Sequence, residues 1–220
     1  MAASHVTIPL QGVSLEGELT VPANAGGLVL FAHGSGSSRH SPRNRYVAAM
    51  LQRAGLGTLL FDLLTEEEED ADALTRHLRF DIPFLAKRLC EVTFWVLEQP
   101  GTKEIKAGYF GSSTGAGAAL VAAAELGDTI GAIVSRGGRP DLAGESLSRV
   151  SAPTLLIVGG NDIPVIPLNH GALEAMHCEK ALRTIPGATH LFEEPGALEK
   201  VALVASEWFC NHLHSLTRRG

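Results

Sequence analysis

A serine flanked by glycines near the middle of the chain is the strongest chemical signal in this sequence. Residues 111–115 read Gly-Ser-Ser-Thr-Gly, a G-x-S-x-G pattern, between an apolar run that ends at Phe110 and a run of small residues over 115–124. A sharp turn from a strand into a helix needs small flanking residues, because the two elements approach closely there, and it presents the central hydroxyl clear of the backbone. The pattern predicts that Ser113 is a nucleophile.

The same glycines also fit a dinucleotide-binding loop. Gly111, Gly115 and Gly117 spell G-x-x-x-G-x-G, as in short-chain dehydrogenases. That loop normally follows the first strand, whereas roughly half of this chain precedes it, and neither Tyr46 nor Tyr109 is followed four residues later by a lysine. The interpretation of Ser113 as a nucleophile is therefore favoured over a dinucleotide-binding loop, and no cofactor is expected. The remaining alternative is a purely structural glycine-rich turn in which the serine has no catalytic role.

A serine hydroxyl is a poor nucleophile at neutral pH, so this prediction requires a base and an acid that orients it. Nucleophiles on such turns are typically followed along the chain by the acid and then by the histidine. Asp162 comes just after an apolar run over 154–158, and His190 follows another over 181–185. Both residues follow a predicted strand, as Ser113 does. We therefore expect Ser113, Asp162 and His190 to form a catalytic triad.

The competing assignments are weaker. Asp162 also fits a helix N-cap or a turn aspartate just before Pro164. Other histidines lie on a predicted helix, near the end of the sequence or away from any strand end: His170, His177, His212, His214, His5, His40 and His77. No H-E-x-x-H or comparable spacing occurs, so no metal site is expected.

A second glycine-serine loop predicts where an oxyanion would be held. Residues 33–38 read His-Gly-Ser-Gly-Ser-Ser and follow the apolar run over 28–32. We expect the backbone N–H of Ser35 to be one donor and that of Thr114, directly after the nucleophile, to be the other, since a helix N-terminus favours negative charge. Taken alone, the loop fits a phosphate-binding nest equally well.

The pattern of hydrophobic residues predicts how these groups are positioned. Alternating apolar residues over 6–10 and 13–21 indicate an antiparallel hairpin at a sheet edge. Short apolar runs then alternate with helical stretches, which is typical of a mostly parallel sheet with helices on both faces, an α/β fold. The strands are expected at 28–32, 58–61, 105–110, 130–134, 154–158 and 181–185, and the helices at 42–54, 81–98, 114–126, 166–177 and 197–214.

The whole chain sets further bounds. Its 220 residues contain no linker-like stretch, so residues 1–220 are expected to form a single domain, and the interval between 134 and 154 leaves room for one short helix and no lid domain. Five consecutive acids over 66–70 predict a solvated loop or, alternatively, a negative lip on the site. A net charge of −6 argues against nucleic acid, so a small molecule is the expected partner.

Cysteine usage and hydropathy address the compartment. The three cysteines are widely spaced without a C-x-x-C pair, so neither a disulfide framework nor a thiolate metal site is expected. The first ten residues have no basic region followed by an apolar run, and no stretch has 18 or more consecutive apolar residues. A cytoplasmic protein without membrane association is expected; oligomeric state is not indicated.

Four stretches spread over most of the sequence resemble, in order, blocks of the dienelactone-hydrolase-like branch of the α/β-hydrolases: residues 30–36, 110–115, 135–140 and 187–192. The resemblance implies the α/β-hydrolase fold and hydrolysis of an ester or lactone. The named dienelactone hydrolases use cysteine where Ser113 stands, so no particular substrate is implied. A thioesterase or acyltransferase would use the same triad, and a non-catalytic binding protein can share the fold.

The resemblance also draws attention to Arg136. This residue follows the predicted strand 130–134 at the end of the sheet where open α/β folds bind ligands. Arginines of dienelactone hydrolases bind a substrate carboxylate, and Arg136 is a candidate for that role. The alternative is a structural arginine paired with a loop acid such as Asp62.

Overall fold

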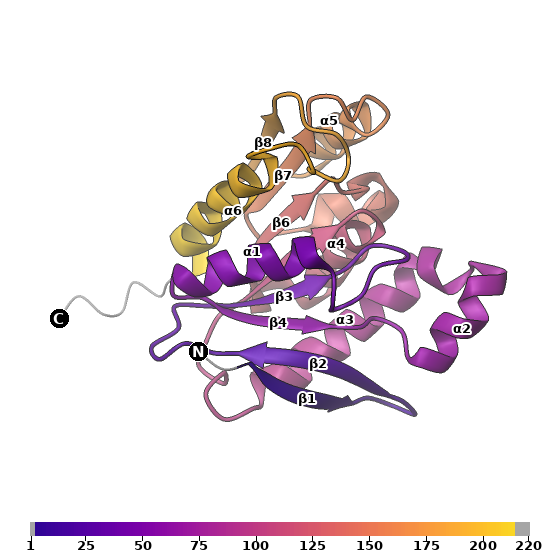
Figure 1. The fold of residues 1–220 in the computed structure, drawn as a ribbon, viewed down its shortest axis with the longest axis vertical. Coiled ribbons are helices and arrows are strands. Elements are labelled where there is room, and N and C mark those ends of the chain that lie inside the picture. The colour runs from indigo at the N-terminus through magenta and orange to yellow at the C-terminus, as the bar shows by residue number, and fades with distance from the viewer. Residues whose placement is uncertain (1–2, 214–220) are drawn as a thin grey trace.

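The computed structural model describes residues 3–213, which are organised around one eight-stranded sheet (Figure 1). Its strands lie in the order β1-β2-β4-β3-β5-β6-β7-β8. β1 and β2 form the expected antiparallel hairpin at one edge, and β3 to β8 run parallel to one another. The strands are β1 (Ser4–Pro9), β2 (Ser14–Thr20), β3 (Leu28–Ala32), β4 (Gly57–Phe61), β5 (Ala107–Ser112), β6 (Ile130–Arg136), β7 (Thr154–Gly159) and β8 (Lys180–Ile185).

Helices cover both faces of this sheet. Apolar residues of α1 and α6 pack on one face, and those of α3, α4 and α5 pack on the other. The helices are α1 (Pro42–Arg53), α2 (Glu66–Thr75), α3 (Ile82–Leu97), α4 (Thr114–Leu126), α5 (Ile166–Ala175) and α6 (Ala197–Leu213), with 3-10 segments η1 (Leu78–Phe80), η2 (Gly127–Thr129) and η3 (Pro140–Arg149). In the part of the chain that the structure describes, no helix is long and apolar enough to cross a membrane.

The predicted α/β architecture is confirmed, with small shifts at the element ends. β5 begins at Ala107 instead of residue 105, and it extends beyond the apolar run to Ser112. β6 likewise continues to Arg136, because Ser112 and Arg136 are still paired across the two strands. The last helix is described to Leu213; His214, where it was expected to end, lies outside the described residues.

The acidic segment 66–70 is not the loop that its charge predicted. It forms the first half of α2, whose N-cap Thr65 accepts a hydrogen bond from the Glu68 N–H, while the Glu68 carboxylate accepts one from the Thr65 N–H. This reciprocal capping satisfies two otherwise unpaired donors, and acidic side chains in a first turn are favoured by the helix dipole. The T-x-x-E spacing was the available signal.

The absence of a lid between β6 and β7 is as expected. Within residues 3–213 that connection contains only η3. The segment that stands beside the carboxyl ends of the central strands is instead α2 with η1, inserted between β4 and α3 (Figure 1). One side of the site is therefore formed by α2 and η1.

Candidate active site

Ser113 occupies a strained turn between β5 and α4. Its φ of 49° and ψ of −123° define a backbone conformation that residues other than glycine rarely adopt. This conformation costs ~1–3 kcal/mol of stability. Packing holds the turn in place: a Cβ on Gly111 would lie 2.5 Å from Cα of Ala116, and one on Gly115 would collide with the carbonyl oxygen of Ala32. The serine stays partly exposed while its neighbours are buried.

Asp162 and His190 are brought together from loops 28 residues apart. Nδ1 of His190 lies 2.7 Å from Oδ2 of Asp162; the carboxylate side chain is 7% exposed and the imidazole 39%. The aspartate side chain does not cap α5, whose N-cap is Val165. With a hydrogen on Nδ1 directed to the carboxylate, Nε2 is left as an acceptor, which is the tautomer that a general base requires.

The loops after β5, β6, β7 and β8 are in contact with one another. The Arg139 N–H donates to the carbonyl of Ser113 at 3.0 Å. A Cβ on Gly137 would lie 3.0 Å from the carbonyl oxygen of His190, and one on Gly159 would lie 2.7 Å from that of Thr189. Within the described residues, Ser113 Oγ and His190 Nε2 are not hydrogen-bonded to each other or to anything else. Such bonds are often long in unliganded sites and tighten when substrate binds.

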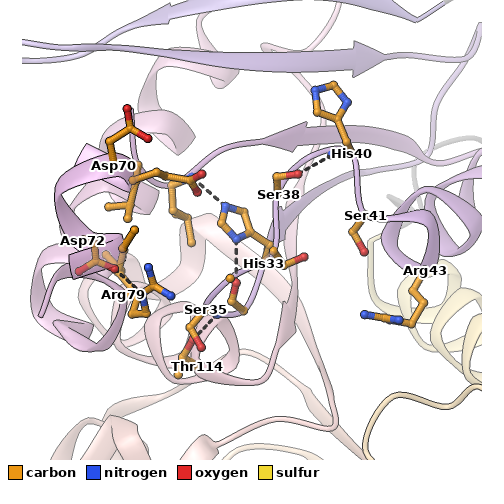
Figure 2. A pocket seen from close by; sticks show the side chains of 18 of the residues that line it. His33, Ser35, Ser38, His40, Ser41, Arg43, Asp70, Asp72, Arg79 and Thr114 are labelled. Atoms are coloured by element: carbon orange, nitrogen blue, oxygen red, sulfur yellow. Dashed lines mark hydrogen bonds and ion pairs between the residues drawn. The ribbon is translucent and has the colours of Figure 1, made fainter. Parts of the chain in front are cut away.

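The two expected oxyanion donors lie side by side, in an arrangement that the sequence did not reveal. The Ser35 N–H donates to Oγ1 of Thr114 at 3.0 Å (Figure 2). Thr114 is the first residue of α4, so its own N–H has no acceptor inside the helix. The Ser35 donor is thus directed at a threonine hydroxyl and not at open space.

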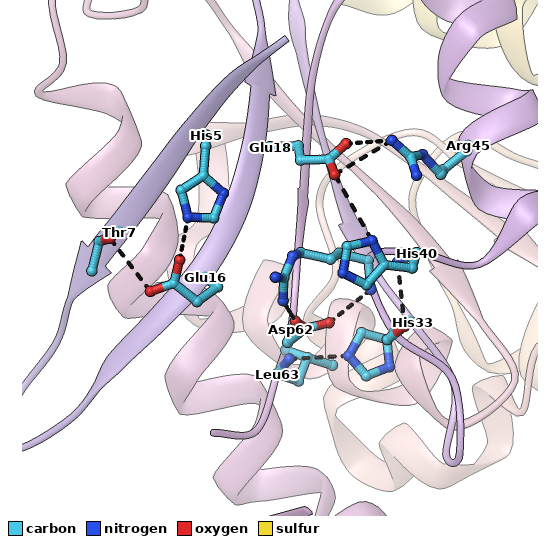
Figure 3. A network of polar contacts seen from close by, with 11 residues as sticks. His5, Thr7, Glu16, Glu18, His33, His40, Arg45, Asp62 and Leu63 are labelled. Carbon is cyan, nitrogen blue, oxygen red and sulfur yellow. Dashed lines mark hydrogen bonds and ion pairs between the residues drawn. The ribbon is translucent and has the colours of Figure 1, made fainter. Parts of the chain in front are cut away.

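His33, which sequence reasoning did not single out, fixes the loop that carries Ser35. Its Nδ1 lies 3.0 Å from the carbonyl oxygen of Gly34, and its Nε2 accepts a hydrogen bond from the Leu63 N–H at 3.0 Å (Figure 3). This pair of bonds requires a neutral ring with its hydrogen on Nδ1. Burial lowers the pKa of His33, which favours the same form. The residue is a positioning group, and its place directly before Gly34 was the only signal.

A cavity of about 580 Å³ opens beside these loops. Ser35 and Thr114 line it, whereas Ser113, Asp162 and His190 do not. One wall comes from α2 and η1. Glu69 and Asp70 line it. So do Asp72 of α2 and Arg79 of η1, which form an ion pair (Figure 2). Apolar surface comes from Leu63, Leu64 and Leu85. Two residues of the acidic segment, Glu69 and Asp70, therefore line this cavity, from a helix and not from a loop.

Arg136 is buried, with 7% of its surface exposed, and its Nε and Nη1 have no hydrogen-bond partner among the described residues. Burial, and secondarily the nearby charge of Arg43, lower its pKa to about 10. The expected alternative, a pair with Asp62, is wrong. Asp62 is bound by both the backbone N–H and the guanidinium of Arg39, because the loop after β3 folds over the end of β4 (Figure 3).

Searches against known sequences give two kinds of result. No family model matches the chain. It is 59% identical over 201 residues to a protein of Mycobacterium tuberculosis that bears the name "Putative phosphoribosyl transferase"; the match covers 91% of this chain and 44% of that protein. The chain therefore spans less than half the length of the curated relatives it matches.

Solved structures match over nearly the whole chain. The crystal structure of a dienelactone hydrolase from Anabaena variabilis is 61% identical, covers 96% of this chain and 98% of its own, and superposes with a TM-score of 0.94. Est1E from Butyrivibrio proteoclasticus, at 16% identity, covers 94% and 98% with a TM-score of 0.79. An esterase from Pyrococcus furiosus, at 18% identity, covers 96% and 93% with a TM-score of 0.74. The last two similarities concern the fold alone.

Proposed function

This chain belongs to the dienelactone-hydrolase-like branch of the α/β-hydrolases, and from that membership we propose that it is a serine hydrolase that cleaves small carboxylic esters or lactones. The observation that carries the proposal is the pairing of His190 with the buried Asp162 at 2.7 Å, at the same end of the sheet as the strained Ser113. A strained nucleophile, a base in the correct tautomer and a buried acid are the components of acyl transfer to serine.

The proposed reaction follows from these positions. Ser113 Oγ attacks the ester carbonyl as Nε2 of His190 accepts its proton, and Asp162 stabilises the resulting imidazolium. The tetrahedral intermediate collapses, the C–O bond of the leaving alcohol breaks, and His190 returns the proton to that alcohol. Water then attacks the acyl-enzyme with the same histidine as base, releasing the acid and Ser113.

Two other functions are compatible with this site, thioester chemistry and ligand binding without catalysis. Hydrolysis or transfer of thioesters needs the same three residues, and a binding protein would need none of their chemistry. The name phosphoribosyl transferase belongs to relatives more than twice as long as the segment matched here, so the name alone assigns no transferase activity to this segment.

A substrate panel tests the proposal. We expect turnover of p-nitrophenyl acetate and butyrate, and little gain with long-chain emulsified esters, because η3 alone occupies the connection where a lid would be inserted. The same protein is assayed with an acyl thioester and a lactone. Turnover of thioesters at rates ~100-fold above those of matched oxygen esters would instead support the thioesterase, and lack of turnover of every substrate would support the binding protein.

We further propose that Arg136 binds a carboxylate on the substrate. A buried guanidinium without a counter-ion costs several kcal/mol, and an incoming anion would remove much of that cost. Its neighbour Arg43 lines the cavity, and its one ion-pair partner within residues 3–213 is the exposed Glu193, at 2.9 Å. Among the described residues only Arg43 of these two neighbouring cations has an acidic partner, which favours an anionic ligand.

Replacing Arg136 by alanine should therefore raise KM by roughly ten-fold or more for an ester with a terminal carboxylate, such as mono-p-nitrophenyl glutarate. KM for the neutral p-nitrophenyl valerate should change little. Arg149→Ala, at an exposed arginine of η3, serves as the control for loss of a cation. Equal losses for both esters together with a lower melting temperature would identify Arg136 as a structural residue.

A further inference from the structure

The hydroxyl of Thr114 lies next to the backbone N–H of Ser35, one of the two groups expected to hold an oxyanion. Thr114 directly follows the nucleophile, is 4% exposed and lines the cavity. Its Oγ1 accepts the Ser35 N–H at 3.0 Å (Figure 2). A backbone N–H has one hydrogen, so the Ser35 donor is committed to this hydroxyl in the unliganded protein.

The hydroxyl itself has a donor to spare. A threonine hydroxyl carries one hydrogen and two lone pairs, and the bond from Ser35 uses only a lone pair. Among residues 3–213 no acceptor takes the Thr114 O–H. The backbone N–H of Thr114 is also free of any acceptor inside α4, and only Cα and Cβ separate it from Oγ1, so both groups can donate to one oxygen atom.

From this geometry we infer that the Thr114 side chain is a catalytic hydrogen-bond donor to the oxyanion. Its O–H and its N–H donate to the carbonyl oxygen as negative charge develops there, while Ser35 N–H donates to the hydroxyl oxygen and strengthens its O–H as a donor. Ser35 then acts through Thr114 and not by direct contact. This inference rests on the proposed hydrolase function and adds a side-chain group to its machinery.

Two substitutions at one position test it. Thr114→Val keeps the shape and removes the hydroxyl, and we expect kcat for p-nitrophenyl butyrate to fall by about 10²-fold or more, as for loss of one oxyanion donor, with KM changed less than roughly two-fold. Thr114→Ser restores the hydroxyl and should keep kcat within about five-fold of wild type. If Thr114 merely occupies the hole, Thr114→Val frees the Ser35 N–H, and an unchanged or higher kcat overturns the inference.

A thiono ester separates oxyanion binding from distortion of the turn. Its C=S sulfur accepts hydrogen bonds weakly, so wild type should strongly prefer the oxygen ester, and Thr114→Val should reduce that preference by about the factor lost in kcat. Equal slowing of both substrates would indicate distortion and contradict the inference. Thr154→Val is the matched control. This buried threonine begins β7, so it lies at the amino ends of the parallel strands, away from the site, and its hydroxyl donates to the Ala152 carbonyl.

The order of the measurements keeps the two proposals apart. Wild-type turnover of the oxygen ester is measured first. A wild type without turnover contradicts the hydrolase function and this inference with it. An active wild type whose Thr114→Val variant retains full kcat contradicts only the role of the Thr114 hydroxyl.

Discussion

Replacing Ser113 by alanine is expected to lower kcat for short esters by a factor on the order of 10⁵ or more, because Ser113, and not Ser112 or Thr114, occupies the strained position of the turn. The same substitution should abolish labelling by a fluorophosphonate, which reacts readily only with a serine activated by an organised base. Turnover by stopped assays and the site of labelling by mass spectrometry of the intact and digested protein are the measurements.

The neighbouring serine provides a matched control. Ser112 is buried at the end of β5, and its hydroxyl points to Oδ1 of Asn44 at 3.4 Å, on the face of the sheet that α1 covers. Ser112→Ala should therefore keep both labelling and turnover near wild type. Labelling that persists in Ser113→Ala would move the nucleophile elsewhere in the chain.

The second large effect is expected from Asp162→Asn. An amide in place of the carboxylate both removes the charge that stabilises the imidazolium and permits a hydrogen to be donated to Nδ1, which leaves the hydrogen of His190 on Nε2, where it cannot accept a proton. We expect kcat to fall about 10⁴-fold while the fold, followed by circular dichroism and melting temperature, is kept. Near-normal turnover would show that another acid orients His190.

An identical substitution away from the site controls for the loss of a charge. Asp128 is exposed in η2, directly before the amino end of β6, whereas His190 follows the carboxyl end of β8. Asp128→Asn should leave kcat and KM unchanged. A comparable loss of turnover there would mean that net charge, and not orientation of the base, accounts for the effect at Asp162.

The central sheet could be predicted from the sequence because its strands are continuous apolar runs between helices. The end of β6 could not, since Arg136 is paired in the sheet and buried although charged. The helix α2 was missed for a related reason: Asp72 is its only buried residue, so no apolar stripe marks it and the capping residues were its only local signal.

The candidate site divides along the same line. The turn at Ser113 and the loops carrying Asp162 and His190 each follow a parallel strand. The carboxyl ends of parallel strands lie at the same end of a sheet, so the sequence positions alone predict that these three residues lie near one another. The bond from Ser35 to Thr114 depends on a rotamer and on the approach of two loops 79 residues apart, which no spacing encodes. The choice of Arg39 over Arg136 as the partner of Asp62 is likewise decided by how a loop folds back.

The way in which α2 is attached has a consequence for the shape of the cavity. Asp72 is the only residue of α2 that is buried, and two ion pairs hold this helix, Glu68 with Arg88 and Asp72 with Arg79. We therefore expect α2 to open locally at a lower free energy than the sheet and to show faster amide hydrogen exchange.

These ion pairs also make the attachment of α2 depend on pH. Burial alone would raise the pKa of Glu68 and of Asp72, but hydrogen bonds from the arginines bring both values below their usual range. The stabilisation is thus present at neutral pH and lost as pH falls through these lowered values. Acid therefore loosens one wall of the cavity, whereas Ser113, Asp162 and His190 lie on the segments that follow β5, β7 and β8 and do not depend on these ion pairs.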